Sequence, residues 1–186
     1  DNLAPRDSLT ANYLRIGSMG LGACIEKVVT GSGWKDRRGK REVTKDGRIR
    51  GLGLACSSYL SGAGLPIYWN GLPHSGVQLK LDRSGLVTAF CGSTDIGQGS
   101  DSVLGWIIGE VLGIDPLGIK VVTGDTDLTP VDLGSYSSRV TLMTGNAAMQ
   151  AAERARDLLQ KGVSEKLGVP PGRLVFADSR VFDAED

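Results

Sequence analysis

The clearest hydrophobic pattern of the chain is a strict alternation that begins at residue 77. Val77, Leu79 and Leu81 alternate with the polar residues Gln78, Lys80 and Asp82. The segment "DRSG" (82–85) has turn residues, and "LVTAFC" (86–91) is a second strand-like run. Alternation with a period of two is typical of a strand with one buried face. The pattern therefore predicts a β-hairpin over residues 77–91.

Two longer segments have the period of an amphipathic helix instead. The first covers about 100–112 and the second about 142–167, and each ends in a glycine followed by proline ("LGIDP", "LGVPP"). Glycine after the last turn, with proline shortly beyond, is a common helix ending. The apolar positions of the first helix are Val103, Leu104, Ile107, Ile108, Val111 and Leu112; those of the second are Ala148, Ala151, Ala152, Ala155, Leu158, Leu159, Val163 and Leu167.

Each predicted helix is followed by another strand-like run, "IKVVT" (119–123) and "RLVFA" (173–177). The C-terminal half therefore has the order β-α-β-α-β. We expect an α+β fold in which both helices cover one face of a mixed sheet. Each helix follows a Gly- and Ser-rich loop at the end of a strand, which is where ligands bind most often in such folds.

The N-terminal part of the chain has a weaker pattern. Residues 20–31 predict a helix that ends at Gly31–Gly33, with Cys24, Ile25, Val28 and Val29 on one face. Residues 34–50 are charged without a period and predict a loop, and 51–75 predict one strand followed by a long surface excursion. We expect a single domain over 1–186, with a leading region at 1–50 and a core at 51–186, as an internal piece of a longer subunit.

Composition excludes several classes of protein. The chain has 186 residues, 40% of them hydrophobic, and its 21 basic residues balance 21 acidic ones. This balance argues against a broad surface for nucleic acid or anionic membrane, although the basic segment "KDRRGKR" (35–41) could contact phosphate or be a solvated loop. Its three cysteines form no C-x-x-C pair, which argues against an iron–sulfur or zinc site here and favours a reducing, cytoplasmic setting. No apolar run approaches the length of a membrane span.

The candidate chemistry lies in the two loops, "TDIGQGSDS" (94–102) and "DLGSYSSRVT" (132–141). Both offer backbone N–H groups at a helix start, together with hydroxyls, and so suit an oxygen-rich group. Asp101 would repel an anion at the first loop, which therefore suits a neutral or metal-oxo partner met by the Gln98 amide. In the second loop the planar guanidinium of Arg139 suits phosphate or carboxylate. The alternative is that both loops are capped helix starts, with Asp95, Asp125 and Asp127 as caps rather than metal ligands.

The segments "GSTDIGQGSDS" and "GDTDLTPVDLGSYSSRVTLMTGNAA" resemble the molybdenum-cofactor-binding large subunit of the xanthine oxidase family. The segments "ACIEKV", "YLSGAGLPIYW" and "PHSGVQLKLDRSG" extend the likeness, which is greatest to the alpha subunit of 4-hydroxybenzoyl-CoA reductase. The resemblance implies that Gln98 hydrogen-bonds an oxo ligand of molybdenum, as the one catalytic residue of this chain. The implied cofactor-binding residues are Gly97, Gln98, Gly99, Ser100, Ser137, Ser138, Arg139, Val140 and Thr141, and no residue of the chain is implied as a metal ligand.

The resemblance also implies a molybdopterin cofactor in its cytosine dinucleotide form, with FAD and [2Fe–2S] clusters on partner chains or domains. The substrate would be a small aromatic or heteroaromatic molecule or an aldehyde, or an aromatic CoA thioester that is reductively dehydroxylated. The family's catalytic glutamate and its Gly-rich Phe/Arg loop have no counterpart in this sequence. We therefore expect the isolated chain to be inactive and to expose apolar surface that favours a homodimer. The alternatives are a non-catalytic phosphate- or nucleotide-binding module and a stand-alone scaffold protein.

Overall fold

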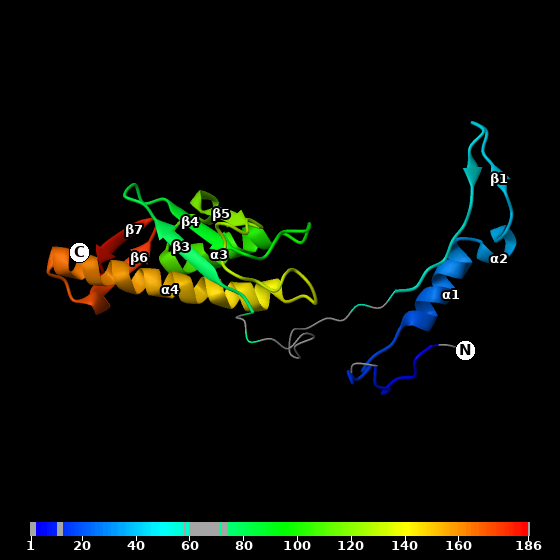
Figure 1. The fold of residues 1–186 in the computed structure, drawn as a ribbon, viewed down its shortest axis with the longest axis horizontal. Helices are drawn as coiled ribbons and strands as arrows, with labels where there is room; N and C mark the ends of the chain where they lie inside the picture. Colours follow the sequence, from blue (N-terminus) through cyan, green and yellow to red (C-terminus); the bar gives the residue numbers. More distant parts are fainter. Residues whose placement is uncertain (1–2, 11–12, 58, 60–70, 72–73, 186) are drawn as a thin grey trace. The chain divides into compact units, whose positions relative to one another are not determined.

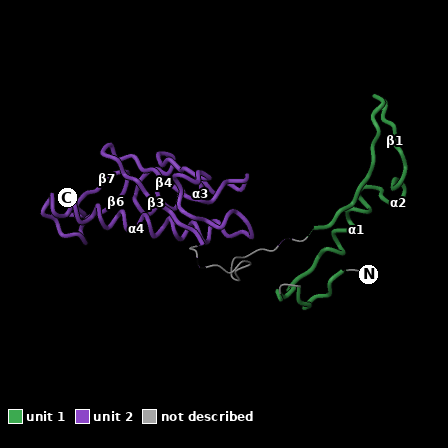
Figure 2. The backbone as a smooth tube through the Cα atoms, viewed as in Figure 1, with its two compact units in different colours: residues 1–58 green, residues 59–186 purple. Residues whose placement is uncertain are grey.

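The computed structural model describes residues 3–10, 13–57, 59, 71 and 74–185. The chain divides into two compact units, residues 1–58 and residues 59–186 (Figures 1 and 2). The single domain expected over 1–186, with a leading region at 1–50 and a core at 51–186, stays a prediction. Both candidate loops belong to the second unit.

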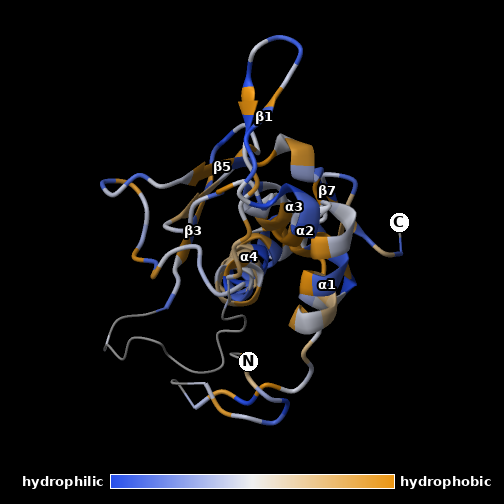
Figure 3. Ribbon diagram, turned by 90° about the vertical axis from the view of Figure 1, so that its right-hand side faces the viewer, coloured by the Kyte–Doolittle hydropathy of each residue, from blue (hydrophilic) through white to orange (hydrophobic). Residues whose placement is uncertain are grey.

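The first unit contains two helices and a small hairpin. Helix α1 (Leu21–Gly31) confirms the predicted helix, although none of its residues is buried; it carries both hydrophobic and hydrophilic residues (Figure 3). The prediction of a loop over 34–50 is wrong in part. This stretch forms the single-turn helix α2 (Trp34–Arg37) and an antiparallel pair, β1 (Glu42–Val43) and β2 (Ile49–Arg50). Strands of two residues are too short for an alternating pattern to be visible in the sequence.

The second unit is built on a three-stranded mixed sheet in the order β3-β4-β5. Strands β3 (Val77–Leu81) and β4 (Val87–Cys91) form the predicted hairpin, with Val77 opposite Cys91 and Leu81 opposite Val87. Strand β5 (Lys120–Thr123) lies parallel to β4. Because β4 and β5 are parallel neighbours, their C-terminal ends and the loops that follow them lie at the same edge of the sheet.

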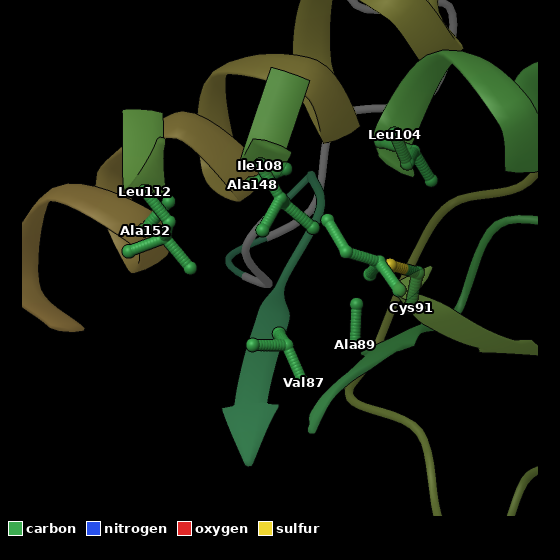
Figure 4. Close-up of a cluster of buried hydrophobic side chains, with 9 residues drawn as sticks. Val87, Ala89, Cys91, Leu104, Ile108, Leu112, Ala148 and Ala152 are labelled. Carbon is green, nitrogen blue, oxygen red and sulfur yellow. The ribbon is translucent and has the colours of Figure 1, made fainter. Parts of the chain in front are cut away.

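Both long helices cover one face of this sheet, as expected. Helix α3 (Ser100–Leu112) and helix α4 (Val140–Leu167) pack against each other, and α4 runs along β3 (Figure 1). The side chains of Val87, Ala89 and Cys91 point from β4 toward the helices (Figure 4). They meet Leu104, Ile108 and Leu112 of α3 and Ala148 and Ala152 of α4. The small alanines allow α4 to lie close to α3 and the sheet.

The last strands form a separate sheet. After α3 the short 3-10 helix η1 (Pro116–Gly118) leads into β5, and after α4 the similar η2 (Pro171–Arg173) leads into β6 (Leu174–Ala177). The order β-α-β-α-β is therefore confirmed. However, β6 pairs with β7 (Arg180–Asp183), a strand that the sequence did not predict, rather than with the main sheet. Ser179 in their turn donates its N–H to the carbonyl of Gly113 at 2.8 Å, which attaches this hairpin to the end of α3.

The strand predicted within 51–75 is not found at the described residues of that stretch, which are 51–57, 59, 71 and 74–75. The rest of that prediction lies outside the described residues. In the described part of the chain, no helix combines the length and the apolar character needed to cross a membrane.

Replacing a core leucine tests the packing of α3. Leu104 is 1% exposed between the sheet and α4, so Leu104→Ala is expected to lower the free energy of unfolding by about 2.5–5 kcal/mol. Leu117 is 86% exposed, so Leu117→Ala is expected to change it by less than about 0.5 kcal/mol. Urea unfolding followed by circular dichroism measures both; equal effects would contradict this core.

Cysteine reactivity gives a second test of the core. Cys24 and Cys56 are exposed, whereas Cys91 is buried in β4. Burial, with the nearby carboxylates of Asp101 and Asp132, raises the pKa of the Cys91 thiol to about 12. At pH 8 a thiol reagent should therefore label two of the three cysteines in the folded protein and all three in denaturant. Rapid labelling of Cys91 in the folded protein would show that β4 is not covered.

Candidate functional site

Two loops lie side by side at the C-terminal ends of β4 and β5. The first loop (residues 92–99) joins β4 to α3, and the second loop (residues 124–139) joins β5 to α4. Their backbones nearly touch, because a Cβ atom at Gly92 would overlap the carbonyl oxygen of Pro130. The hydroxyl of Ser135 joins them: it accepts the N–H of Thr94 at 3.1 Å and donates to the carbonyl of Thr94 at 2.5 Å.

A cavity of about 300 Å³ opens between the two loops and the start of α4, and is called the loop cavity below. It is lined by Tyr59, Ile96, Gln98, Ser135, Tyr136, Ser138, Arg139, Val140 and Thr141. Five of the residues singled out from the sequence therefore meet at one cavity: Gln98, Ser138, Arg139, Val140 and Thr141. Of the other four, Gly97, Gly99 and Ser137 lie in the same loops and Ser100 is the first residue of α3, but none of them is part of the lining.

The amide of Gln98 is held by hydrogen bonds within its own loop. Its Oε1 accepts the N–H of Ile96 at 2.6 Å. Its Nε2 donates to the carbonyl of Thr94 at 3.2 Å and to the hydroxyl of Ser100 at 3.0 Å. The side chain thus has a defined place at the edge of the loop cavity although the residue is exposed. A ligand that accepts a hydrogen bond from Nε2 would replace one of these two partners.

The glycines on both sides of Gln98 have left-handed backbones. Gly97 has a φ of 102° and Gly99 a φ of 78°, values that L side chains rarely adopt. A Cβ atom at either position would meet no atom of the described residues within 4 Å. Glycine is therefore required here for the turn, and it also leaves open space beside the Gln98 amide.

The N-terminus of α3 is already occupied by a carboxylate of the protein. Asp95 accepts the N–H of Gly97 at 2.7 Å, of Gly99 at 3.4 Å and of Asp101 at 3.3 Å. The N–H of Gly97, the strongest of these contacts, holds the pKa of Asp95 below its usual value, while burial raises the pKa of Asp101. Asp95 thus accepts N–H groups at the start of this helix, as in the alternative interpretation of the sequence, and the first loop does not offer an anion site at the helix end.

The N-terminus of α4 differs, because its first turn contains no acidic residue. The first N–H groups of an α-helix have no partner within the helix, so they suit oxygen atoms of a ligand. Ser137 and Ser138 precede the helix with φ values of 52° and 55°, and the N–H of Ser138 donates to the hydroxyl of Tyr59 at 3.2 Å. Two consecutive left-handed residues other than glycine are strained, which is typical of functional loops.

The guanidinium of Arg139 points into the protein, where it is 1% exposed. Its Nη1 donates to Asp132 and to the carbonyl of Gly134, both at 2.7 Å, and its Nη2 donates to Ser75 at 2.8 Å and to the carbonyl of His74. The carboxylate that Arg139 binds is therefore that of Asp132. The expectation of a ligand phosphate or carboxylate at this guanidinium is corrected, because all of these partners are internal.

Asp132 is the important residue that the sequence did not reveal. Its second oxygen accepts the hydroxyl of Thr144 at 3.1 Å, and Thr144 also contacts Ser75 at 3.1 Å. The ring of Tyr136 lies 5.6 Å from the guanidinium carbon of Arg139. A single aspartate seven positions before an arginine forms no motif, so only their shared burial identifies this pair. The pair fixes the second loop, the segment before β3 and the start of α4 to one another.

The side chains around the loop cavity are suited to hydrogen bonding rather than to direct metal binding. The side chains offer an amide and hydroxyls, and the backbone of the lining residues offers N–H groups. Within residues 3–10, 13–57, 59, 71 and 74–185, no group of three His, Cys, Asp or Glu side chains is arranged to hold a metal ion.

Removing Asp132 tests the buried pair. Asp132→Ala leaves the guanidinium of Arg139 buried without its counter-ion, so we expect a loss of about 3–5 kcal/mol in the free energy of unfolding. Glu185→Ala removes only a partly exposed contact with Arg173 and should cost less than about 1 kcal/mol. Urea unfolding of both variants measures these losses. A loss of less than about 1 kcal/mol in the free energy of unfolding of Asp132→Ala would show that the pair does not hold the loops.

Comparison with known proteins agrees with this geometry. Residues 27–186 match the family described as "Molybdopterin cofactor-binding domain". The chain is 34% identical over 139 residues to the xanthine dehydrogenase molybdenum-binding subunit of Escherichia coli O157:H7, covering 74% of this chain and 18% of that protein. It is 37% identical over 134 residues to 6-hydroxypseudooxynicotine dehydrogenase complex subunit gamma of Paenarthrobacter nicotinovorans, covering 72% and 16% respectively.

Among solved structures, quinoline 2-oxidoreductase from Pseudomonas putida 86 is similar with a TM-score of 0.56 and 25% sequence identity, covering 60% of this chain and 14% of that one. The chain thus spans less than a fifth of the length of each of these proteins. The family match covers both loops and the helices that they precede. The chain therefore belongs to the molybdopterin cofactor-binding domains of the molybdenum-binding subunits of the xanthine oxidase family.

Proposed function

We propose that this chain forms one wall of the cofactor pocket in a molybdenum-dependent oxidoreductase of the hydroxylase type. The observation that carries the proposal is that Gln98 and the N-terminus of α4 line one cavity although they lie some forty residues apart. A molybdopterin cofactor has an oxygen-bearing metal at one end and a phosphate at the other. Such a group needs a hydrogen-bond donor and an anion site at neighbouring positions, which the loop cavity provides.

The residues present fit such a group. Next to Gln98, the open space at Gly97 and Gly99 is not filled by any side chain of the described residues. Asp95 already compensates the N-terminus of α3, whereas the first turn of α4 carries no acidic side chain. The two ends of the cavity therefore differ in the charge of the ligand group that they favour. The neutral amide end suits the oxygen atoms on the metal, and the helix end suits phosphate.

Each residue then has a defined role. Gln98 would donate a hydrogen bond from Nε2 to an oxygen on the metal, in exchange for its present bond to Ser100. The hydroxyls of Ser138 and Thr141, and the N–H groups in the first turn of α4, would hold the pterin and its phosphate. Arg139 would act indirectly, by fixing the loop that carries these groups. When bound, the cofactor supplies a two-electron redox centre.

The finer features of the parent protein rest on its relatives. The names of two relatives describe them as subunits, one of a dehydrogenase complex. This supports partner chains for the present protein, for which we propose FAD and [2Fe–2S] clusters, with the catalytic base on a segment beyond these 186 residues. Xanthine and quinoline, which occur in the names of similar proteins, are heteroaromatic, and we propose a substrate of that type. An aromatic CoA thioester and the cytosine dinucleotide form of the cofactor are narrower proposals, based on the sequence resemblance alone.

Replacing Gln98 in the complete enzyme tests this function. Gln98→Ala removes the amide donor, and Gln98→Glu retains the shape of the side chain without the donor. Loss of one donor aimed at the reacting centre should lower kcat about 100-fold, with molybdenum content and the unfolding midpoint close to those of the unmodified enzyme.

Gln150 lies exposed on α4 outside the loop cavity, so Gln150→Ala is the matched control and should leave kcat unchanged. Unchanged turnover in both Gln98 variants would remove Gln98 from the reaction. A complete protein that is purified with a nucleotide but without molybdenum would contradict the proposed function and favour the non-catalytic binding module.

A further inference from the structure

Ser135 holds the first loop from outside. Its hydroxyl forms two hydrogen bonds with the backbone of Thr94, one with the N–H group and one with the carbonyl oxygen. Among the described residues, these are the only hydrogen bonds that connect residues 94–99 to any segment beyond α3. The remaining bonds of the first loop run within itself or to the first residues of α3.

The carbonyl oxygen that receives the Ser135 hydroxyl also receives the amide of Gln98. Ser135 donates to it at 2.5 Å and Gln98 Nε2 at 3.2 Å. A carbonyl oxygen has two lone pairs, so it can accept both bonds at once. This oxygen is therefore one of the three groups that hold the Gln98 amide, with the N–H of Ile96 and the hydroxyl of Ser100. Ser135 fixes the position of this oxygen.

The first loop needs such an outside restraint. Residues 94–99 are all exposed, and the two glycines beside Gln98 can adopt more backbone conformations than other residues. Without a fixed carbonyl at Thr94, ordering the Gln98 side chain would cost additional conformational entropy.

Ser135 is itself placed by the buried ion pair. The preceding residue, Gly134, donates its N–H to Asp132 at 2.7 Å and accepts Arg139 Nη1 at its carbonyl, also at 2.7 Å. The N–H and the carbonyl of Gly134, which precedes Ser135, are thus both hydrogen-bonded to a pair that is almost fully buried. The buried pair thus fixes the backbone before Ser135. Ser135 in turn fixes the backbone of Thr94, and the carbonyl of Thr94 binds the amide of Gln98.

We propose that Ser135 is a positioning residue, which orients the Gln98 amide toward the ligand of the loop cavity through the carbonyl of Thr94. The proposal rests on the proposed function for its catalytic consequence, whereas the coupling of Ser135 to Gln98 is a property of this chain alone. Ser135 has no acid–base or redox role, and no bond is made or broken at its hydroxyl.

Hydrogen exchange in the complete protein tests the coupling. The N–H of Ile96 is protected by Gln98 Oε1, so its exchange rate reports the placement of that amide. Ser135→Ala should raise the exchange rate at Ile96 about five- to tenfold, while Ser135→Thr, which retains a hydroxyl, should restore most of the protection. Ser102 lies exposed in the first turn of α3, and Ser102→Ala is the control that should leave this rate unchanged.

A double-mutant cycle tests the catalytic consequence. Ser135→Ala should lower kcat about tenfold in the unmodified enzyme but less than about twofold in the Gln98→Ala background, because the residue acts through Gln98. Equal losses in both backgrounds, or unchanged protection at Ile96 in folded Ser135→Ala, would overturn the proposal. If Gln98→Ala alone has full activity while Ser135→Ala still exposes Ile96, the coupling stands and the proposed function fails.

Discussion

The site depends on the burial of one ion pair, Asp132 with Arg139. Their side chains are 0% and 1% exposed, and the bond between them is 2.7 Å long. Burying two charges carries a large desolvation cost, which is offset only if most of their hydrogen-bonding groups find partners. The two backbone carbonyls at His74 and Gly134 and the hydroxyls of Ser75 and Thr144 are those partners. A loop without regular structure thereby acquires a fixed conformation.

The fixed loop explains why the chain can place two chemically different groups beside one cavity. Parallel pairing of β4 with β5 brings the ends of two strands to one edge of the sheet, and α3 and α4 both start there. The start of α3 is compensated by Asp95, and the start of α4 has no acidic residue. One fold therefore offers a neutral amide and a helix end that favours anions. The left-handed residues Gly97 and Gly99 lie on both sides of the amide, and the left-handed Ser137 and Ser138 precede the helix end.

Periodic segments of the sequence predicted the fold well, and the less regular ones did not. The hairpin over 77–91, the helix at 100–112 and the strand near 119–123 follow from alternation or helical spacing, and the structure has each of them. Helix α4 begins at Val140, two residues earlier than its apolar period suggested, because Arg139, directly before the helix, is anchored inside the protein. Strand β7 escaped prediction because four residues are too few for a recognisable alternation, and it pairs with β6 instead of extending the main sheet.

The residue types of the candidate site were predictable from the sequence, but the hydrogen bonds and ion pairs that hold them were not. Glycines around one amide, and hydroxyls before a helix, are visible in the sequence as unusual local composition. The partner of Arg139 cannot be identified in the sequence, because a buried aspartate and an exposed one look alike in a loop.

The central claim is that the two loops together bind one molybdenum cofactor. Its most direct test is crystallography of the complete protein with anomalous diffraction at the molybdenum edge. We expect one anomalous peak beside Gln98, with an oxygen on the metal within hydrogen-bonding distance of Gln98 Nε2, and phosphate density at the start of α4. A molybdenum peak remote from both loops would contradict this claim.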